Sequence, residues 1–294
     1  MPRQKENTRM YDTIENIRNS QIQHGPSSNR IYLMKVDAGD LPGLLPRLDE
    51  LAEKEGYTKI FAKIPADLKQ QFTLNGYEEE ASIPAFYKGT GTGLFLSKYF
   101  SEDRRIEQNA KEIRDIVDLS ISKSEKKKKH RSFHTYHLYK AKPADAKEMS
   151  EVYEEVFDSY PFPIYEPRYL QETMETHIQY FAVRSGVKIV SLASSEIDYE
   201  AGNVEMTDFA TLPRYRGQGL GHWLLSRMET EMRSEGIATA YTIARALEPG
   251  INILFARRGY EYGGTIHNNT NIGGQIESMN VWYKSLVLDH SRDV

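Results

Sequence analysis

The hexapeptide R-G-Q-G-L-G at residues 216–221 constrains this chain more than any other stretch. It lies between an apolar, strand-like segment ending at Leu212 and the helical pattern W-L-L-S-R-M-E-T-E-M. Three glycines at alternate positions allow a tight turn, so that backbone N–H groups at the start of the next helix can approach an anion. The sequence therefore predicts a strand–turn–helix unit that binds a pyrophosphate.

The length of 294 residues predicts two domains rather than one. Changes in composition divide the chain into a polar N-terminal arm (1–29), a small α/β domain (30–103), a helical and basic linker (104–133) and a second α/β domain (134–294). The linker carries four consecutive lysines, which are typical of a solvated connection. An anion-binding tail is the alternative, but no aromatic residues are interleaved with these lysines to support it.

Composition excludes several classes of function. The formal net charge is −4, which indicates neither a nucleic-acid nor a membrane partner. The absence of cysteine excludes disulfides and thiolate chemistry, and no apolar run reaches the roughly 20 residues of a membrane span. The N-terminal residues do not resemble a secretory signal. We expect a cytoplasmic protein without a metal site, and the sequence makes no prediction about its oligomeric state.

The two halves of the chain end in similar strings. The first contains E-G-Y-T-K-I-F-A-K-I and then L-N-G-Y-E, and the second contains E-G-I-A-T-A-Y-T-I-A-R and then R-R-G-Y-E. The first half has no glycine-rich turn, because residues 41–47 hold one glycine and two prolines. It is predicted to be a reduced copy that cannot hold the cofactor and serves packing, dimerisation or a wall of the substrate pocket.

Three kinds of phosphate cradle compete for the glycine turn. A P-loop needs Gly-Lys-Ser/Thr, whereas Gly221 is followed by His222 and Trp223. A dinucleotide-binding fold places its turn early in a βαβ unit, and here the turn follows a series of antiparallel-looking strands. The order strand, R-x-x-G-x-G, helix, strand and a short helix ending in R-R-G-Y fits a third type of cradle.

That order resembles the GNAT superfamily of acyl-CoA N-acetyltransferases, over about residues 134–288. The resemblance implies a mixed α/β fold in which a centrally splayed sheet is flanked by helices, here preceded by a smaller, reduced GNAT-like domain. It also implies acetyl-CoA as cosubstrate. The residues expected to hold it are the turn (Arg216, Gly217, Gln218, Gly219, Leu220, Gly221), the strand before it (Phe209, Ala210, Thr211, Leu212) and the last helix (Asn252, Phe255).

The strings Y-P-F-P-I, E-M-T-D-F-A-T-L-P, A-Y-T-I-A-R-A and E-S-M-N-V-W-Y-K resemble the beta-lysine N-acetyltransferases. This closer resemblance includes the first half, at G-Y-E-E-E-A-S-I-P-A-F-Y-K-G. It implies acetylation of the ε-amine of β-lysine to Nε-acetyl-β-lysine, a compatible solute. The residues alone lead only to an amine acyltransferase, so another small amine such as a polyamine stays open. A CoA-binding regulatory module without turnover is the third hypothesis.

Catalysis requires a base, because a protonated amine cannot attack a thioester. Glu205 and Asp208 are the candidates, acting through water, and Glu205 matches a strand glutamate that many relatives use. Asn252 either bonds the pantetheine arm or caps its own helix. Phe255 stands where many relatives carry an acidic tyrosine, which leaves Tyr260, Tyr262 or water to protonate the thiolate.

A lysine-like acceptor also presents a carboxylate and an aliphatic stem. Arg245 is the first candidate for the carboxylate, because arginine offers a bidentate fork, and Arg168 is the second. Further expected contacts are aromatic walls for the stem and polar groups for a second amine: Tyr160, Tyr165, Asn268 and Asn269.

Overall fold

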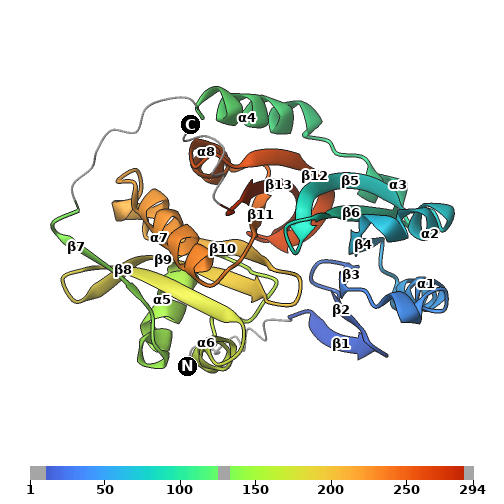
Figure 1. Ribbon diagram of the computed structural model, residues 1–294, viewed down its shortest axis with the longest axis horizontal. Helices are drawn as coiled ribbons and strands as arrows, with labels where there is room; N and C mark the ends of the chain where they lie inside the picture. Colours follow the sequence, from blue (N-terminus) through green and yellow to red (C-terminus); the bar gives the residue numbers. More distant parts are fainter. Residues whose placement is uncertain (1–10, 125–132, 288–294) are drawn as a thin grey trace, which may run out of the picture.

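The computed structural model describes residues 11–124 and 133–287, and all thirteen strands in these ranges form one sheet. The strand order is β1-β2-β3-β4-β6-β5-β12-β13-β11-β10-β9-β8-β7, so the two halves of the chain lie end to end across the sheet (Figure 1). Helices flank it, which confirms the predicted mixed α/β class. No helix in the described ranges is long and apolar enough to cross a membrane.

The second half begins at β7. Its elements are β7 (Tyr136–Lys140), α5 (Ala146–Val156), α6 (Pro167–Met174), β8 (Ile178–Ser185), β9 (Lys188–Asp198), β10 (Asn203–Thr211), α7 (Leu220–Ser234), β11 (Thr239–Arg245), α8 (Pro249–Arg257), β12 (Glu261–Ile272) and β13 (Gln275–Ser285). Helices α5 and α7 lie on opposite sides of β8–β10 (Figure 1). The apolar residues of α7 recur at helical spacing and face the core: Leu220, Leu224, Leu225, Met228 and Met232.

The first half contains β1 (Thr13–Ile17), β2 (Ser20–Gly25), β3 (Arg30–Lys35), α1 (Leu44–Glu55), β4 (Lys59–Pro65), α2 (Lys69–Leu74), β5 (Glu78–Tyr87) and β6 (Gly91–Tyr99). It repeats the topology of the second half with one strand fewer before the crossover and without counterparts of α5 and α6. In both, an antiparallel series leads through a helix to a parallel neighbour (β3 to β4, β10 to β11), and an antiparallel hairpin follows. The repeat in the sequence is therefore a repeat in the fold.

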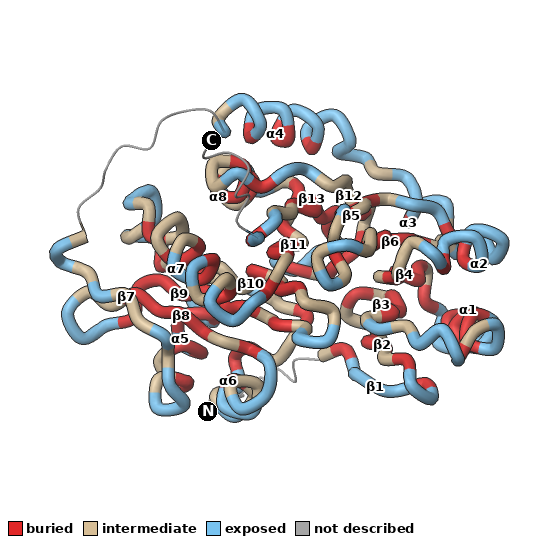
Figure 2. The backbone as a smooth tube through the Cα atoms, viewed as in Figure 1, coloured by how far each residue is buried: buried red, intermediate tan, exposed pale blue. Residues whose placement is uncertain are grey.

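The predicted arm is more ordered than expected, and the predicted linker is helical at its start, as expected, but packs on the second half. Residues 13–25, placed in a polar arm, form β1 and β2, and Ile22 is fully buried between the sheet and α1. The start of the predicted linker forms α3 (Glu102–Arg105) and α4 (Ala110–Ser122). Helix α4 packs on α8, with its buried residues on that side (Figure 2). The lysine run at 126–129 lies outside the described residues, and the domain limits stay predictions.

The halves meet where β5 pairs with β12, at Ala81 and Gly264. Gly264 has a φ of 139°, and a β-carbon there would overlap the carbonyl oxygen of Glu80, so the strands approach closely only because this residue is glycine. An aromatic and aliphatic cluster seals the junction, and it contains Phe61, Phe86 and Phe95 from the first half and Tyr241, Ile266 and Val281 from the second. The junction is therefore a packed core.

Candidate active site

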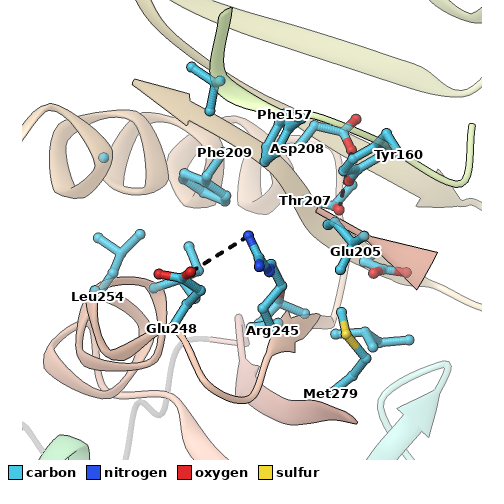
Figure 3. A pocket seen from close by; sticks show the side chains of 18 of the residues that line it. Phe157, Tyr160, Glu205, Thr207, Asp208, Phe209, Arg245, Glu248, Leu254 and Met279 are labelled. Atoms are coloured by element: carbon cyan, nitrogen blue, oxygen red, sulfur yellow. Dashed lines mark hydrogen bonds and ion pairs between the residues drawn. The ribbon is translucent and has the colours of Figure 1, made fainter. Parts of the chain in front are cut away.

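A cavity of about 1310 Å³ runs through the second half and continues to the first. The glycine turn and α8 line one part of it, and the middle of β10 lines another, where Glu205, Thr207 and Asp208 succeed one another (Figure 3). Its far wall is formed by side chains of β2, β3 and β4. The first half thus forms a wall of the cavity, one of the three roles predicted for it.

The middle of the cavity opens because β10 and β11 separate. They pair in parallel only from Asn203 to Glu205, with Thr239 to Tyr241 as partners. Residues 206–211 continue along β9 alone, with a bulge between Thr207 and Ala210. At the bulge Asp208 has a φ of 55°, an uncommon conformation for a non-glycine residue. The predicted central splay is confirmed, and it leaves one edge of β10 facing the gap.

The glycine turn has the backbone that an anion site requires. Gly217 and Gly219 have φ values of 73° and 86°, which favour glycine, and α7 begins at Leu220. Within the described chain no side chain caps that helix start. A β-carbon on Gly217 would meet no described atom within 4 Å. Backbone donors and the positive end of the helix dipole therefore face the cavity, which fits the pyrophosphate of acetyl-CoA.

The side chains of the turn have separate roles. Arg216 lines the cavity, and its Nε donates to the carbonyl of Thr211 at 3.1 Å, which fixes the guanidinium beside the end of β10. Gln218 does not line the cavity; its Oε1 accepts from the Tyr136 hydroxyl at 2.5 Å. The positive charge of Arg216 therefore lies at the cavity, whereas the side-chain amide of Gln218 joins the turn to β7.

Glu205 lies deep in the cavity, on the strand where splaying begins. Burial raises the pKa of Glu205 to about 8, and the carboxylate of Glu196 acts in the same direction, whereas Lys63 and a hydrogen bond with Tyr241 oppose the shift. Lys63 donates to the Tyr241 hydroxyl at 3.2 Å. A carboxyl group that titrates near neutrality is suited to accept a proton from an ammonium group.

Asp208 is held in place by two hydroxyl groups. Ser194 donates to its Oδ2 at 2.5 Å, and the Tyr160 hydroxyl donates to Oδ1 (Figure 3). Burial raises the pKa of Asp208, and these two hydrogen bonds oppose the shift. Both oxygens are thus engaged within the chain, and Asp208 connects the bulge of β10 to the proline-rich loop that carries Tyr160.

Arg245 lines the cavity, but its guanidinium is already paired within the chain. Its Nε and Nη2 donate to Glu277 at 2.8 and 2.6 Å, and its Nη1 lies 3.6 Å from Glu248 (Figure 3). The fork expected to hold a substrate carboxylate is occupied by a carboxylate of β13. Arg168, the second candidate, is an exposed residue paired with Glu172 one helical turn away.

Neither Asn252 nor Phe255 lines the cavity, and of the two roles predicted for Asn252 the structure shows the bond at its own helix start. Asn252 is fully buried; its amide donates to the carbonyls of Arg245 and Glu248, and its oxygen accepts from Asn280 and Trp282. Every hydrogen-bonding position is used to fix α8 to β11 and β13. Phe255 is fully buried and packs edge-on against Phe209 and Tyr260. Both residues support the fold.

The remaining predicted residues divide in the same way. Tyr160 and Asn269 line the cavity, together with Phe209, Thr211, Leu220 and Gly221. Ala210 and Leu212 are buried beneath it. Tyr165 instead donates to the carbonyl of Phe157 at 3.0 Å, and Asn268 donates to the carbonyls of Arg104 and Ile106. Tyr260 is buried outside the cavity, and Tyr262 hydrogen-bonds Thr265.

Sequence reasoning allowed for a cavity wall from the first half but named none of the residues that form it, among them Gln23, Arg30, Tyr32 and Lys63. One signal was present. Residues 30, 32 and 34 on β3, and 59, 61 and 63 on β4, alternate with the aliphatic residues that pack under α1 and α2. The described ranges contain no group of three or more acidic or histidine side chains arranged to hold a metal ion.

Comparison with known proteins agrees with this geometry. The model of the acetyltransferase (GNAT) family matches residues 146–260. A beta-lysine N(6)-acetyltransferase from Methanococcus maripaludis is 39% identical over 274 residues, which cover 93% of this chain and 98% of that protein. Another from Methanosarcina mazei is 34% identical, covering 81% and 95%, and the N-acetyltransferase YodP from Bacillus subtilis is 32% identical, covering 90% and 95%.

These likenesses extend over both halves of the chain, whereas the family model covers only part of the second half. The chain belongs to the GNAT family of acetyltransferases, enzymes that transfer an acyl group from acetyl-CoA to an amine.

Proposed function

We propose that this protein transfers the acetyl group of acetyl-CoA to the ε-amine of β-lysine. Two relatives that match it over most of their length are named as beta-lysine N(6)-acetyltransferases. The structural observation that carries the proposal is a continuous cavity that joins the glycine turn, Glu205 and the first half. It provides a place for the anionic donor at one end and for a long acceptor at the other.

The donor lies with its pyrophosphate on the backbone of residues 217–221 and its thioester beside the splayed edge of β10. Arg216 adds a fixed positive charge near the phosphates. Backbone N–H groups around the bulge, from Phe209 to Thr211, stabilise the thioester oxygen as negative charge develops on it. Bulge and splay act together here, because each withdraws part of the strand from ordinary sheet pairing.

Glu205 acts as the general base through a water molecule. It removes a proton from the ε-ammonium, and the free amine nitrogen attacks the thioester carbon. The C–S bond then breaks and the amide forms, and the second proton that the nitrogen gives up passes through water to the CoA thiolate. Burial and the neighbouring Glu196 keep the pKa of Glu205 near the operating range, at about 8. Asp208 positions the bulge and the loop rather than exchanging the proton.

The product suits a role as a compatible solute, which we propose for it in the cytoplasm. At neutral pH β-lysine carries two ammonium groups and one carboxylate, and acetylation removes one positive charge. The resulting zwitterion has no net charge and perturbs other charged molecules less at high concentration. We expect cells that use it in this way to accumulate Nε-acetyl-β-lysine after a rise in external salt, and a strain lacking this chain not to do so.

The substrate is tested with purified protein, acetyl-CoA and separate β-lysine, lysine and spermidine, following free CoA thiol. We expect release with β-lysine at a kcat/KM well above the other two, and acetylation at the ε-nitrogen by NMR of the product. Release with spermidine but not β-lysine contradicts the proposed acceptor. CoA binding without release for any amine contradicts the enzymatic role and indicates a CoA-binding module.

A further inference from the structure

The cavity face of β2 and β3 carries a buried arginine. Arg30 lies on β3 with only 4% of its surface exposed, although it lines the cavity. Its Nη1 donates to the carbonyl of Asn269 at 2.9 Å and to the Thr270 hydroxyl at 3.0 Å. Among the described residues, no acidic side chain forms an ion pair with Arg30, and its Nε has no hydrogen-bond partner. A buried edge of the guanidinium therefore lacks an acceptor within the described chain.

Two buried amide oxygens lie on the same stretch of wall. Oε1 of Gln23 and Oδ1 of Asn269 have no partner in the described part of the chain, and both residues line the cavity at about 1% exposure. Gln23 pairs with Tyr32, and Arg30 with Gly25, so Gln23 and Arg30 are diagonal neighbours on one face of the β2–β3 ladder. Asn269 touches Arg30 through its carbonyl.

Buried polar atoms without partners are rare in folded proteins because each costs free energy. Here one strong donor and two acceptors are left unsatisfied together, on residues of one cavity wall. Burial lowers the pKa of Arg30 to about 10, and the buried carboxylate of Asp12, which lies against Gly25 opposite Arg30, opposes this shift only in part. A bound anion would compensate the guanidinium, and a bound ammonium group would satisfy the two oxygens.

The equivalent position in the second half makes a bond between the halves without an arginine. The β3–β4 and β10–β11 registers align Arg30 with Asn203. Asn203 also donates across the junction, from its amide to the carbonyl of Phe86 at 3.2 Å. A short neutral side chain is thus sufficient for the bond between halves. The bond between the halves does not require the positive charge of Arg30 or its unpartnered Nε donor.

We propose that the first half binds the amino-acid end of the acceptor, with Arg30 holding its carboxylate and the side-chain oxygens of Gln23 and Asn269 holding its 3-ammonium group. This inference rests on the proposed function, because it takes a β-amino acid as the acceptor. It assigns the first half a part in substrate selection. The stem of the acceptor then extends along the cavity, past Tyr32 and Tyr160, toward Glu205.

Three acceptors allow the carboxylate contact and the 3-ammonium contact to be measured separately. β-Lysine has both the carboxylate and the 3-ammonium group, 6-aminohexanoate lacks only the 3-ammonium group, and 1,4-diaminopentane lacks only the carboxylate. In the Arg30→Gln variant we expect kcat/KM to fall about 100-fold for β-lysine and for 6-aminohexanoate. Both acceptors carry a carboxylate, and the variant loses the charged hydrogen-bonded pair between that carboxylate and Arg30. The value for 1,4-diaminopentane should change less than about threefold. A Gln23→Met variant should lose activity with β-lysine but not with 6-aminohexanoate.

Arg104→Gln is the matched control. Arg104 is a second buried arginine that donates to the same strand, at the carbonyls of Asn268 and Asn269, but it does not line the cavity. A loss caused only by loosening β12 would appear in both arginine variants and with all three acceptors. That outcome overturns the proposal. So does a fall in kcat/KM in Arg30→Gln that is equal for the acceptors with a carboxylate and for 1,4-diaminopentane.

A second measurement separates this proposal from the function on which it rests. If the wild-type protein acetylates none of the three amines, the proposed function fails. Calorimetry then measures binding of 6-aminohexanoate to the wild-type protein and to Arg30→Lys, which keeps the charge without the fork. Binding that is weakened at least about tenfold in the variant supports the carboxylate site. Equal binding, or no binding to either protein, contradicts it.

Discussion

The two halves of this chain share one topology but differ at the same crossover. In the second half, the turn before α7 has two glycines with positive φ and an uncapped helix start among the described residues. In the first half, the turn before α1 holds Asp40, whose buried carboxylate accepts from the backbone and hydroxyl of Ser20. Its N-cap, Gly43, has a φ of −68°. An acidic turn without left-handed glycines does not suit a phosphate.

The strands beside the turns differ as well. Residues 206–211 of β10 extend beyond the last pair with β11, whereas β3 ends two positions after its last pair with β4. The register aligns Glu205 and Tyr241 with Tyr32 and Phe61. The position of the Glu205 carboxyl group in the second half is thus held by the aromatic ring of Tyr32 in the first. The comparison teaches that a shared backbone does not carry function; the turn, the splay and a few strand residues do.

Replacing the proposed base should have the largest effect. Glu205→Gln is expected to lower kcat about 1000-fold, which is within the usual contribution of a positioned general base. In the wild-type protein the rate should rise with pH through about 8, as Glu205 loses its proton, and this rise should vanish in the variant. Stopped-assay pH profiles measure both effects. The control is Glu80→Gln, a buried carboxyl group of the first half that does not line the cavity.

A retained pH profile in Glu205→Gln would contradict the assignment of the base. An equal loss of kcat in Glu80→Gln would mean that catalysis is not confined to the second half.

The glycine turn offers the next test. Gly219→Val should weaken CoA binding roughly 100-fold, because valine is strained at a φ of 86° and its side chain displaces the donor. The matching change in the first half is Gly43→Ala, where the backbone is ordinary and the nearest atom to a new β-carbon is 3.7 Å away. We expect its CoA affinity to equal that of the wild-type protein in calorimetry. Unchanged affinity in Gly219→Val would place the donor elsewhere.

Asp208→Asn should have a smaller effect, about a tenfold fall in kcat, because Asp208 positions the bulge rather than taking the proton. Tyr160→Phe removes the same hydrogen bond and should give a similar fall. The kcat of the double variant should therefore lie within about threefold of that of either single variant, since both changes break the same hydrogen bond between Tyr160 and Asp208. Fully multiplicative losses, or a shifted pH midpoint, would give Asp208 a role in proton transfer.

The smallest effect concerns stability. The pKa of Glu205 is about 8 in the folded protein and ordinarily 4.5, so its contribution to stability is fully present below pH 4.5 and is lost as pH rises through 8. Glu205→Gln removes this loss. Its Tm should therefore exceed that of the wild-type protein by roughly 6 °C more at pH 9 than at pH 5. A Tm difference that does not change with pH would contradict the raised pKa.

The sequence was sufficient where the signal is local. The glycine spacing of residues 216–221 requires positive φ values, and the structure has them at Gly217 and Gly219. It was insufficient where a partner is distant. The guanidinium of Arg245 is paired with Glu277 on another strand, and the side-chain oxygen of Asn252 accepts a hydrogen bond from Asn280 of β13. The sequence around Arg245 and Asn252 indicates neither partner. The wall containing Arg30 exists only because the halves pack together, so no motif marks it.

The central claim is that one half holds the donor and the other holds the amino-acid end of the acceptor. A crystal structure of the protein with CoA and β-lysine tests it most directly. We predict the pyrophosphate on the backbone N–H groups of residues 217–221 and the carboxylate on Nε and Nη2 of Arg30. A carboxylate bound at Arg245 with Glu277 displaced, or CoA lying against the turn before α1, would contradict the account.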